Sequence, residues 1–195
     1  MVSRGAKEFW GRDDYPWVHG AMQENPMPTD TSPALYPTRN DLPPMLRLQV
    51  CELLNRCLAD CIDLQTQCKQ AHWNVKGVNF IALHKLFDDI NGTVEEYVDL
   101  LAERVVQLGG VAEGTLRLVA TRSTLEPYPP LISDADQHID ALGVALAAFG
   151  RTARRGIDEM AELGDADSAD ILTEISRGVD KWLWFVEAHL PPRKR

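Results

Sequence analysis

The stretch that decides the fold is LHKLFDDINGTVEEYVDLLAERVVQL, residues 83–108. Its large apolar residues recur three and four positions apart, at Leu83, Phe87, Ile90, Val94, Tyr97, Leu101, Val105 and Leu108. This spacing places them on one side of an α-helix, because about 3.6 residues complete each turn. A long helix with one apolar side is stable when that side packs against other helices. The stretch therefore predicts one member of a helical bundle.

Another helical stretch precedes this one. It begins after Asp41, with Pro43 and Pro44 in the opening turn, where a missing backbone N–H breaks no helical hydrogen bond. It runs to about Trp73, and Gly77 lies in the turn that follows. Two helices joined by so short a turn run antiparallel. The sequence therefore predicts a helical hairpin.

The second helix of this hairpin has recognisable ends. Asn79 can cap its beginning, and a Gly-Gly pair follows its last apolar residue, Leu108. The next segment, residues 111–132, is long for a loop and contains three prolines. We expect this segment to be a crossover between two hairpins, with one short helix near residues 111–116.

Two more helices follow the crossover. Ser133 is the expected cap of the third helix, which runs to about Leu163 and ends at Gly164. The fourth helix spans roughly Asp167 to His189. Two helical hairpins joined by one long crossover have the connectivity of ferritin-like bundles. The sequence therefore predicts an all-α, ferritin-like four-helix bundle.

The predicted bundle covers residues 43–190, and sequence of a different kind flanks it. Residues 1–42 have no sustained periodicity, and seven prolines lie from Pro16 to Pro44. A Pro-rich segment of this kind does not form a packed domain. We therefore expect a Pro-rich arm over residues 1–42 and a short basic tail over residues 191–195.

The composition limits the classes of protein that remain. The chain has 195 residues, 45% of them apolar, and a formal charge of −9. So acidic a chain is a poor general binder of nucleic acid, because phosphate contacts need Lys and Arg. No apolar run approaches the roughly 18 residues of a membrane span, and none resembles a secretory signal. We expect a cytoplasmic protein that does not enter a membrane.

The cysteines give no sign of a metal or redox motif. No Cys-x-x-Cys pair occurs, which argues against a zinc ribbon or a thioredoxin-type site. Reduced cysteine behaves as a small apolar residue when it is buried. We therefore interpret the four thiols as core residues without chemistry: Cys51, Cys57, Cys61 and Cys68.

Four candidate metal ligands share the helix of residues 83–108 with the apolar stripe. With His84 at 0°, Asp88, Asp99 and Glu103 lie at about 40°, 60° and 100°, whereas the stripe is centred near 260°. The candidate ligands therefore form a second side of the helix, which points away from the core of their own bundle.

These ligands cannot all reach one ion within a single chain. Asp88 and Asp99 are eleven residues apart, which is roughly 16 Å along the axis, whereas metal–ligand bonds are about 2 Å long. The midpoint of residues 84 and 103 is 93.5, as is the midpoint of 88 and 99. An antiparallel second copy, related by a twofold axis at that level, would bring the pairs together. Gly92 lies beside the midpoint and would let the two backbones approach.

His72 is a fifth candidate, because an antiparallel hairpin brings the end of one helix beside the start of the next. Two imidazoles and three carboxylates suit iron, manganese or zinc. Any one of these side chains alone is more often a solvated helix residue, but the shared midpoint favours a metal site for the set. No Glu-x-x-His occurs in the chain, so the usual di-iron site inside a bundle is missing.

Several runs of residues carry a resemblance to a known family. The run QAHWNVKGVNFIALH, residues 70–84, resembles the first signature of the Dps family, the mini-ferritins. The run DLLAER, residues 99–104, with the Gly-Gly pair that follows, resembles the second. The runs ADIL, residues 169–172, and DKWLWF, residues 180–185, resemble its last helix. The resemblance covers about residues 45–190.

The resemblance implies an activity and an assembly. Dps proteins form hollow shells of twelve subunits, with ferroxidase sites at the dimer interfaces. Their ligands fall on His72, His84 and Asp88 of one subunit and on Asp99 and Glu103 of its partner. The family implies oxidation of Fe(II), usually by hydrogen peroxide in preference to oxygen, and storage of the ferric product. Iron would be both bound and stored.

Two further features stay open. Asp165, Asp167 and Asp170 fall where the family has pores through which ferrous ions enter, although capping of the last helix explains them equally well. The only basic run is residues 193–195, so we expect weak DNA binding. The alternative function is a DNA-compacting or structural shell protein with a vestigial metal site, associated with the nucleoid.

Overall fold

The computed structural model describes residues 35–190 of the chain. Most of the predicted Pro-rich arm and the whole basic tail over residues 191–195 lie outside the described residues. Residues 35–42, which we assigned to the arm, are attached to the bundle, because the Tyr36 backbone N–H donates to the Gly109 carbonyl at 2.7 Å.

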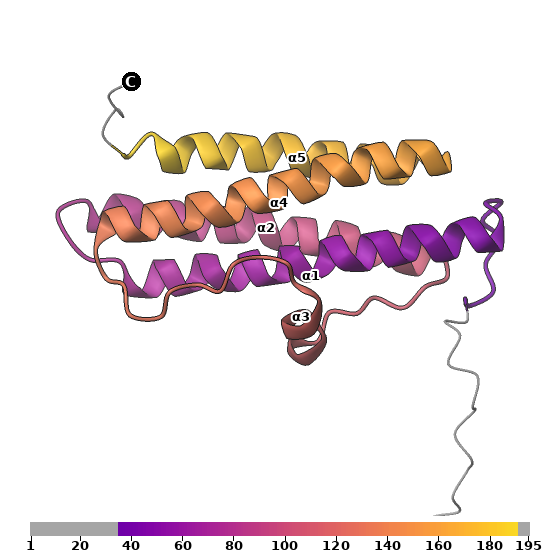
Figure 1. Ribbon diagram of the computed structural model, residues 1–195, viewed down its shortest axis with the longest axis horizontal. Coiled ribbons are helices and arrows are strands. Elements are labelled where there is room, and N and C mark those ends of the chain that lie inside the picture. The colour runs from indigo at the N-terminus through magenta and orange to yellow at the C-terminus, as the bar shows by residue number, and fades with distance from the viewer. Residues whose placement is uncertain (1–34, 191–195) are drawn as a thin grey trace, which may run out of the picture. The chain divides into compact units, whose positions relative to one another are not determined.

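Residues 35–190 form five helices: α1 Pro44–Asn74, α2 Phe80–Gln107, α3 Leu116–Arg122, α4 Ala135–Leu163 and α5 Ala166–Glu187. Figure 1 shows α1 beside α2 and α4 beside α5, with the crossover and α3 running over α1. Contacts of α1 with α4 and of α2 with α5 join the two hairpins. The described residues form no β-strand, only one isolated bridge between Lys76 and Asp134. The predicted ferritin-like four-helix bundle with a long crossover is confirmed.

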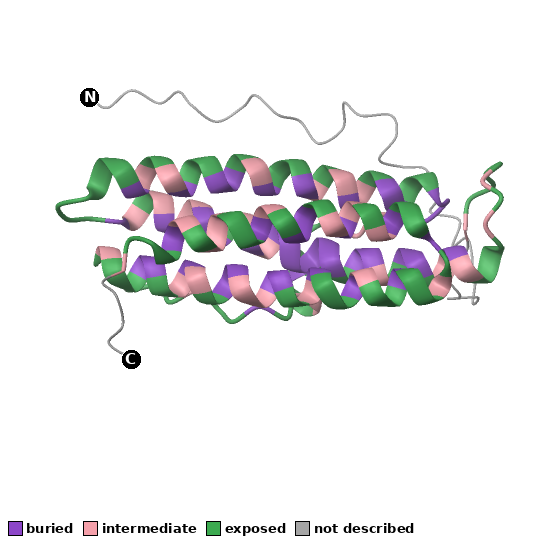
Figure 2. Cartoon of the chain, turned by 90° about the horizontal axis from the view of Figure 1, so that it is seen from above, coloured by how far each residue is buried: buried purple, intermediate pink, exposed green. Residues whose placement is uncertain are grey.

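The core lies between the four long helices, as the buried inner sides in Figure 2 show. All eight residues of the apolar stripe on α2 are buried. The four cysteines of α1 are also buried and form no disulfide. Burial raises the pKa of the Cys57 and Cys68 thiols to about 12 and that of the Cys61 thiol well above its usual value. None of the described helices has the length and apolar character that crossing a membrane requires.

Some of the helix ends agree with those predicted from the sequence, and others do not. Pro44 opens α1, and Gly164 ends α4 in the left-handed region with φ 82°, both as predicted. Asn79 is the N-cap residue of α2, as predicted, but its side chain makes no capping hydrogen bond. The predicted cap at Ser133 is wrong: the Asp134 side chain caps α4 by accepting from the Asp136 N–H at 2.9 Å. The Ser133 carbonyl instead accepts from the Lys76 N–H at 3.1 Å.

The short helix of the crossover lies later than predicted. We expected it near residues 111–116, whereas α3 begins at Leu116. The reason is a contact with α1: the Asn55 amide donates to the Val111 carbonyl and accepts from the Glu113 N–H, each at 3.0 Å. These bonds hold residues 111–113 against α1, so the helix starts only after them.

A row of polar side chains on α1 fixes the rest of the crossover. One carboxylate oxygen of Asp60, a buried residue, accepts from the Thr124 N–H at 2.6 Å. Asp63 accepts from the Ser123 hydroxyl at 2.6 Å, and the Gln67 amide donates to the Glu126 carbonyl at 3.1 Å. We call Asn55, Asp60, Asp63 and Gln67 the crossover-binding row. The row pairs with crossover polar groups that would otherwise be left unsatisfied.

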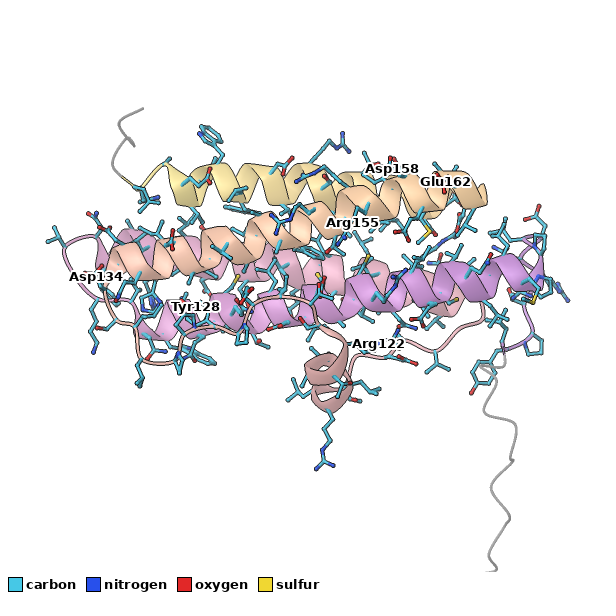
Figure 3. All side chains as sticks on the ribbon, viewed as in Figure 1. Arg122, Tyr128, Asp134, Arg155, Asp158 and Glu162 are labelled. Atoms are coloured by element: carbon cyan, nitrogen blue, oxygen red, sulfur yellow. The ribbon has the colours of Figure 1, made fainter. Side chains whose placement is uncertain are left out.

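The far end of the crossover is tied down by a buried histidine. Figure 3 labels Tyr128 on the crossover, and its hydroxyl lies 2.5 Å from Nδ1 of His138 on α4. His138 is fully buried, and its Nε2 has no hydrogen-bond partner among the described residues. Burial lowers the pKa of this imidazole. Together with the bond from Lys76 to Ser133, this contact holds the α1–α2 turn against the start of α4.

Candidate metal centre

His72 and His84 meet where α1 ends and α2 begins. The antiparallel hairpin stacks their imidazole rings, with centroids 3.7 Å apart and planes inclined by 21°. Both side chains are half-buried. The sequence predicted that these two residues would lie together, and the structure places them so.

Reciprocal hydrogen bonds fix the orientation of both rings. His72 Nδ1 lies 2.7 Å from the His84 carbonyl oxygen, and His84 Nδ1 lies 2.8 Å from the His72 carbonyl oxygen. A carbonyl oxygen only accepts, so each Nδ1 carries the proton and donates. Each neutral ring then has its lone pair on Nε2, and no hydrogen bond with a described residue engages that atom. Backbone bonds of this kind orient histidines that bind metals.

Asp88 adds a carboxylate beside the rings. One of its oxygens lies 4.0 Å from His72 Nδ1, and the same oxygen accepts from Lys69 Nζ at 2.5 Å. The hydrogen bond from Lys69 is the main reason that the pKa of the Asp88 carboxyl is lowered. Asp88 is exposed and anionic, and Lys69 occupies part of the space in which a cation would approach it.

Asp99 and Glu103 lie further along α2 and do not join the histidines within the chain. Both are exposed, and neither side chain makes an ion pair or hydrogen bond within residues 35–190. No three His, Cys, Asp or Glu side chains of the described part of the chain are grouped so that they could hold a metal ion. One chain therefore presents an incomplete set of ligands.

Two exposed apolar residues flank this side of α2. Ile81 is 60% exposed and Val106 is 59% exposed, although most large apolar residues of α2 are buried. By the helical period they lie at about 60° and 40° on the scale that sets His84 at 0°, which is within the arc of the candidate ligands. Their midpoint is again residue 93.5. Sequence reasoning missed this pair, although their spacing was visible in the sequence.

Comparison with known proteins bears on the family and the fold of the chain. The ferritin-like domain family matches residues 51–193. A DNA protection during starvation protein from Agrobacterium fabrum is 44% identical over 155 residues, which cover 80% of this chain and 96% of that protein. The chain belongs to the Dps family.

Solved Dps structures have the same fold. DpsC from Streptomyces coelicolor aligns with a TM-score of 0.78 and 31% identity, covering 83% of this chain and 95% of that one. Dps from Mycobacterium smegmatis, in its tetragonal form, aligns with a TM-score of 0.76 and 31% identity, covering 80% and 96%. The predicted family and fold class are thereby confirmed for this Dps chain.

The acidic residues between α4 and α5 do not all have the role predicted for them. Asp165 is buried and caps α5, and Arg104 donates to its carboxylate at 2.7 Å. Ser168 donates its hydroxyl to the other oxygen of Asp165 at 2.5 Å. The contacts of Asp165 therefore support helix capping, the alternative that we gave. Asp167 and Asp170 are exposed, so the pore stays a prediction for them.

Sequence reasoning missed Arg104, which is buried on α2 and bonds to α5 across the bundle. A charged residue amid the apolar stripe was the signal that could have found it. Figure 3 shows that Asp158 and Glu162 lie on α4 towards the same end of the bundle as this capping network. Part of the negative charge around the α4–α5 turn therefore serves to cap α5 and to bind Arg104.

Proposed function

We propose that this Dps chain is a ferroxidase and iron-storage protein, which oxidises Fe(II) between two copies of itself. Two ferrous ions would each lose one electron to one molecule of hydrogen peroxide, which takes up two protons and leaves as two molecules of water. The ferric product would collect inside a hollow shell of twelve copies in the cytoplasm. Membership of the Dps family and the ferritin-like fold support this proposal.

One observation carries the proposal: the paired histidines are oriented by the backbone yet keep Nε2 of each ring free of hydrogen bonds. The two rings are stacked on each other with Asp88 beside them, which distinguishes them from His189, an exposed ring with a similar single backbone contact. Imidazole nitrogen and carboxylate oxygen together suit iron, and carboxylates stabilise the ferric ion more than the ferrous one. Ligands of this kind favour the loss of an electron.

A twofold pair of chains would complete the set of ligands. His84 would meet Glu103 of the partner subunit, and Asp88 would meet the partner's Asp99, because both pairs share one midpoint. The same rotation would bring Ile81 against the partner's Val106 and remove two exposed apolar side chains from water. An apolar contact in the same register as two polar ones supports the pairing, which is self-complementary.

The test is stopped-flow oxidation of ferrous iron by peroxide after anaerobic loading. We expect His84→Ala and Glu103→Ala each to lower the catalysed rate by about tenfold or more, because each removes a ligand. His189→Ala and Asp89→Asn are matched controls, since both residues lie outside the candidate set, and we expect wild-type rates from them. Oxidation by wild type at the uncatalysed rate would contradict the proposal.

DNA binding is separable from iron oxidation. We predict weak binding at physiological salt, because the chain is acidic and its one basic run is short. Residues 193–195 lie outside the described residues, so the structure does not bear on them. A gel-shift titration at low and moderate salt, with and without these residues, measures their contribution. Tight, salt-resistant binding without iron oxidation would favour the alternative function, a DNA-compacting shell.

A further inference from the structure

A groove runs between α1 and α4, near the end of the bundle where α1 begins and α4 ends. Its volume is about 670 Å³. Three half-buried leucines line it: Leu48, Leu53 and Leu163. Apolar side chains that remain partly in water gain free energy when another apolar group covers them. The α1–α4 groove is therefore a surface that a partly apolar segment could cover.

The rim of the α1–α4 groove is acidic. Three carboxylates and one cation line it, which gives a net charge of −2: Glu52, Glu159, Glu162 and Arg56. Glu52 and Glu159 are each paired through one carboxylate oxygen only. The Glu162 side chain makes no ion pair or hydrogen bond among the described residues. The rim thus presents carboxylate oxygens without a partner to whatever binds in the groove.

Residues 190–195 have the complementary composition. Their sequence is LPPRKR, in which three apolar residues precede three cations. The run RKR is the only run of three cations in a chain with a formal charge of −9. Leu190 is half-buried, and residues 191–195 lie outside the described residues. An apolar half followed by a basic half matches a groove that has leucines along its floor and carboxylates at its rim.

The groove and the basic run belong to opposite ends of the bundle. Figure 1 shows α5 running back along α4. Gly150 packs against Val179. Gly156 packs against Leu172, and the residue numbers of these two pairs add to 329 and 328. Glu162 is therefore level with about residue 167, which is roughly 30 Å along the axis from the end of α5.

The length of the intervening chain excludes the groove of the same copy. Lys194 follows Leu190 by four residues, which span at most about 14 Å when fully extended. This reach is about half of the roughly 30 Å that separates the end of α5 from the level of Glu162. The basic run can therefore meet such a groove only on a second copy of the chain.

We propose that residues 190–195 of one copy bind in the α1–α4 groove of a second copy, with the three cations on the acidic rim and the apolar half over the leucines. The inference does not rest on the metal centre or on the twofold pairing of α2. It gives the basic run a protein partner in place of DNA. Exposed ion pairs are individually weak, but several such contacts in one assembly reinforce one another.

Carbodiimide coupling tests the contact, because this reagent joins an amine to a carboxylate only where the two groups touch. Lys194 carries the only amine of residues 188–195. We expect the full-length chain at low salt to form covalent dimers in which mass spectrometry finds Lys194 joined to Glu162. Lys194→Arg keeps the charge but cannot couple, so we expect at least fivefold fewer dimers. A link between these residues within one chain, or no link, would overturn the proposal.

Two carboxylates of α4 provide a matched pair of variants. Figure 3 labels both Asp158 and Glu162, which are exposed and one turn apart, but only Glu162 lines the groove. The measurement is the rate at which trypsin cleaves the full-length chain after Arg193. We expect Glu162→Gln to raise this rate by about threefold, the scale of one exposed ion pair, and Asp158→Asn to leave it unchanged.

Salt and DNA separate the possible partners of the basic run. Salt at about 1 M screens charges beyond about 3 Å, so it should raise the cleavage rate of wild type to that of Glu162→Gln. Equal rates for wild type and Glu162→Gln at low salt would contradict the proposal. Protection from trypsin that appears only after duplex DNA is added would mean that nucleic acid is the partner, and the proposal would fail.

Discussion

The α1–α2 hairpin carries two rows of polar side chains that differ in one respect. The crossover-binding row on α1, residues 55, 60, 63 and 67, has hydrogen bonds to the crossover at each of its side chains. On the outer side of the hairpin, Asp99 and Glu103 of α2 have no partner in the described chain, and His72 of α1 and His84 of α2 each keep one ring nitrogen free of hydrogen bonds. The spacing of the polar residues along their helices does not distinguish these two sets of side chains.

The difference shows how a structural polar residue is told from a functional one. A side chain whose donors and acceptors are all satisfied inside the chain is explained by the fold. A side chain that the fold orients but leaves unpaired is available to bind something outside the chain, which we propose here to be a partner subunit and a ferrous ion. Four changes, taken from the largest expected effect to the smallest, test this distinction.

The largest effect is expected at the crossover-binding row. Asp60→Ala removes the acceptor for the Thr124 N–H and hydroxyl and for the Thr152 hydroxyl. We expect the free energy of unfolding to fall by about 3 kcal/mol, because several buried donors lose their partner. Urea unfolding followed by circular dichroism measures it. Glu52→Ala, which breaks a more exposed ion pair with Arg122, is the control, and we expect a loss below about 1 kcal/mol.

Lys69 gives one of the candidate ligands, Asp88, a partner within the chain. Lys69→Met removes the cation beside Asp88, so a ferrous ion no longer competes with an ammonium group. We expect anaerobic Fe(II) binding to tighten by about fivefold, because an exposed ion pair is worth up to about 1 kcal/mol. Isothermal titration measures the affinity, and Lys181→Met, on α5, is the control. Weaker binding would mean that Lys69 positions Asp88 as a ligand and does not compete with the metal.

Substitution of Gly92 tests whether this side of α2 is exposed to solvent or covered by a partner subunit. A Cβ at this position meets nothing within 4 Å in the single chain. Alanine should therefore stabilise the isolated helix by up to about 1 kcal/mol, since glycine is a poor helix former. In the proposed pair, the added methyl group faces the partner's Glu95, so we expect Gly92→Ala to dissociate more readily on dilution. Gly143→Ala, equally open on α4, should stabilise the chain and leave its assembly unchanged.

The smallest effect is expected at His138, a buried residue. Its Nδ1 contacts the Tyr128 hydroxyl, but its Nε2 has no hydrogen-bond partner among the described residues. Its pKa is lowered by burial, so the unfolded chain binds a proton more readily than the folded one. The free energy of unfolding should therefore decrease as the pH falls below about 6.5, and stop decreasing below the lowered pKa. Denaturant unfolding of wild type and His138→Gln over this range measures the difference. Identical pH profiles would contradict the prediction.

The parts of the molecule that could be predicted from sequence depend on local patterns. The four long helices follow from apolar periodicity, and the eight residues of the α2 stripe are all buried as expected. The meeting of His72 with His84 follows from a short turn between antiparallel helices. The twofold completion of the site follows from a shared midpoint and stays a prediction, because a single chain cannot display it.

What escaped prediction depends on residues far apart in the chain. The position of α3 is set by Asn55, which bonds to residues 56 and 58 positions away. The burial of Asp165 depends on Arg104, 61 positions earlier. Neither contact produces a periodic pattern in the sequence. A single polar residue on a helix does not reveal which distant residue it will contact.

The buried thiols of α1 bear on how such a chain could tolerate the oxidant that it is proposed to consume. Peroxide attacks the thiolate form of sulfur, and burial holds Cys57, Cys61 and Cys68 in the protonated form well beyond neutral pH. The interior therefore keeps its sulfur atoms in their slowest-reacting state. If the chain consumes peroxide as we propose, burial of these thiols should slow the formation of sulfenic acid during repeated turnover.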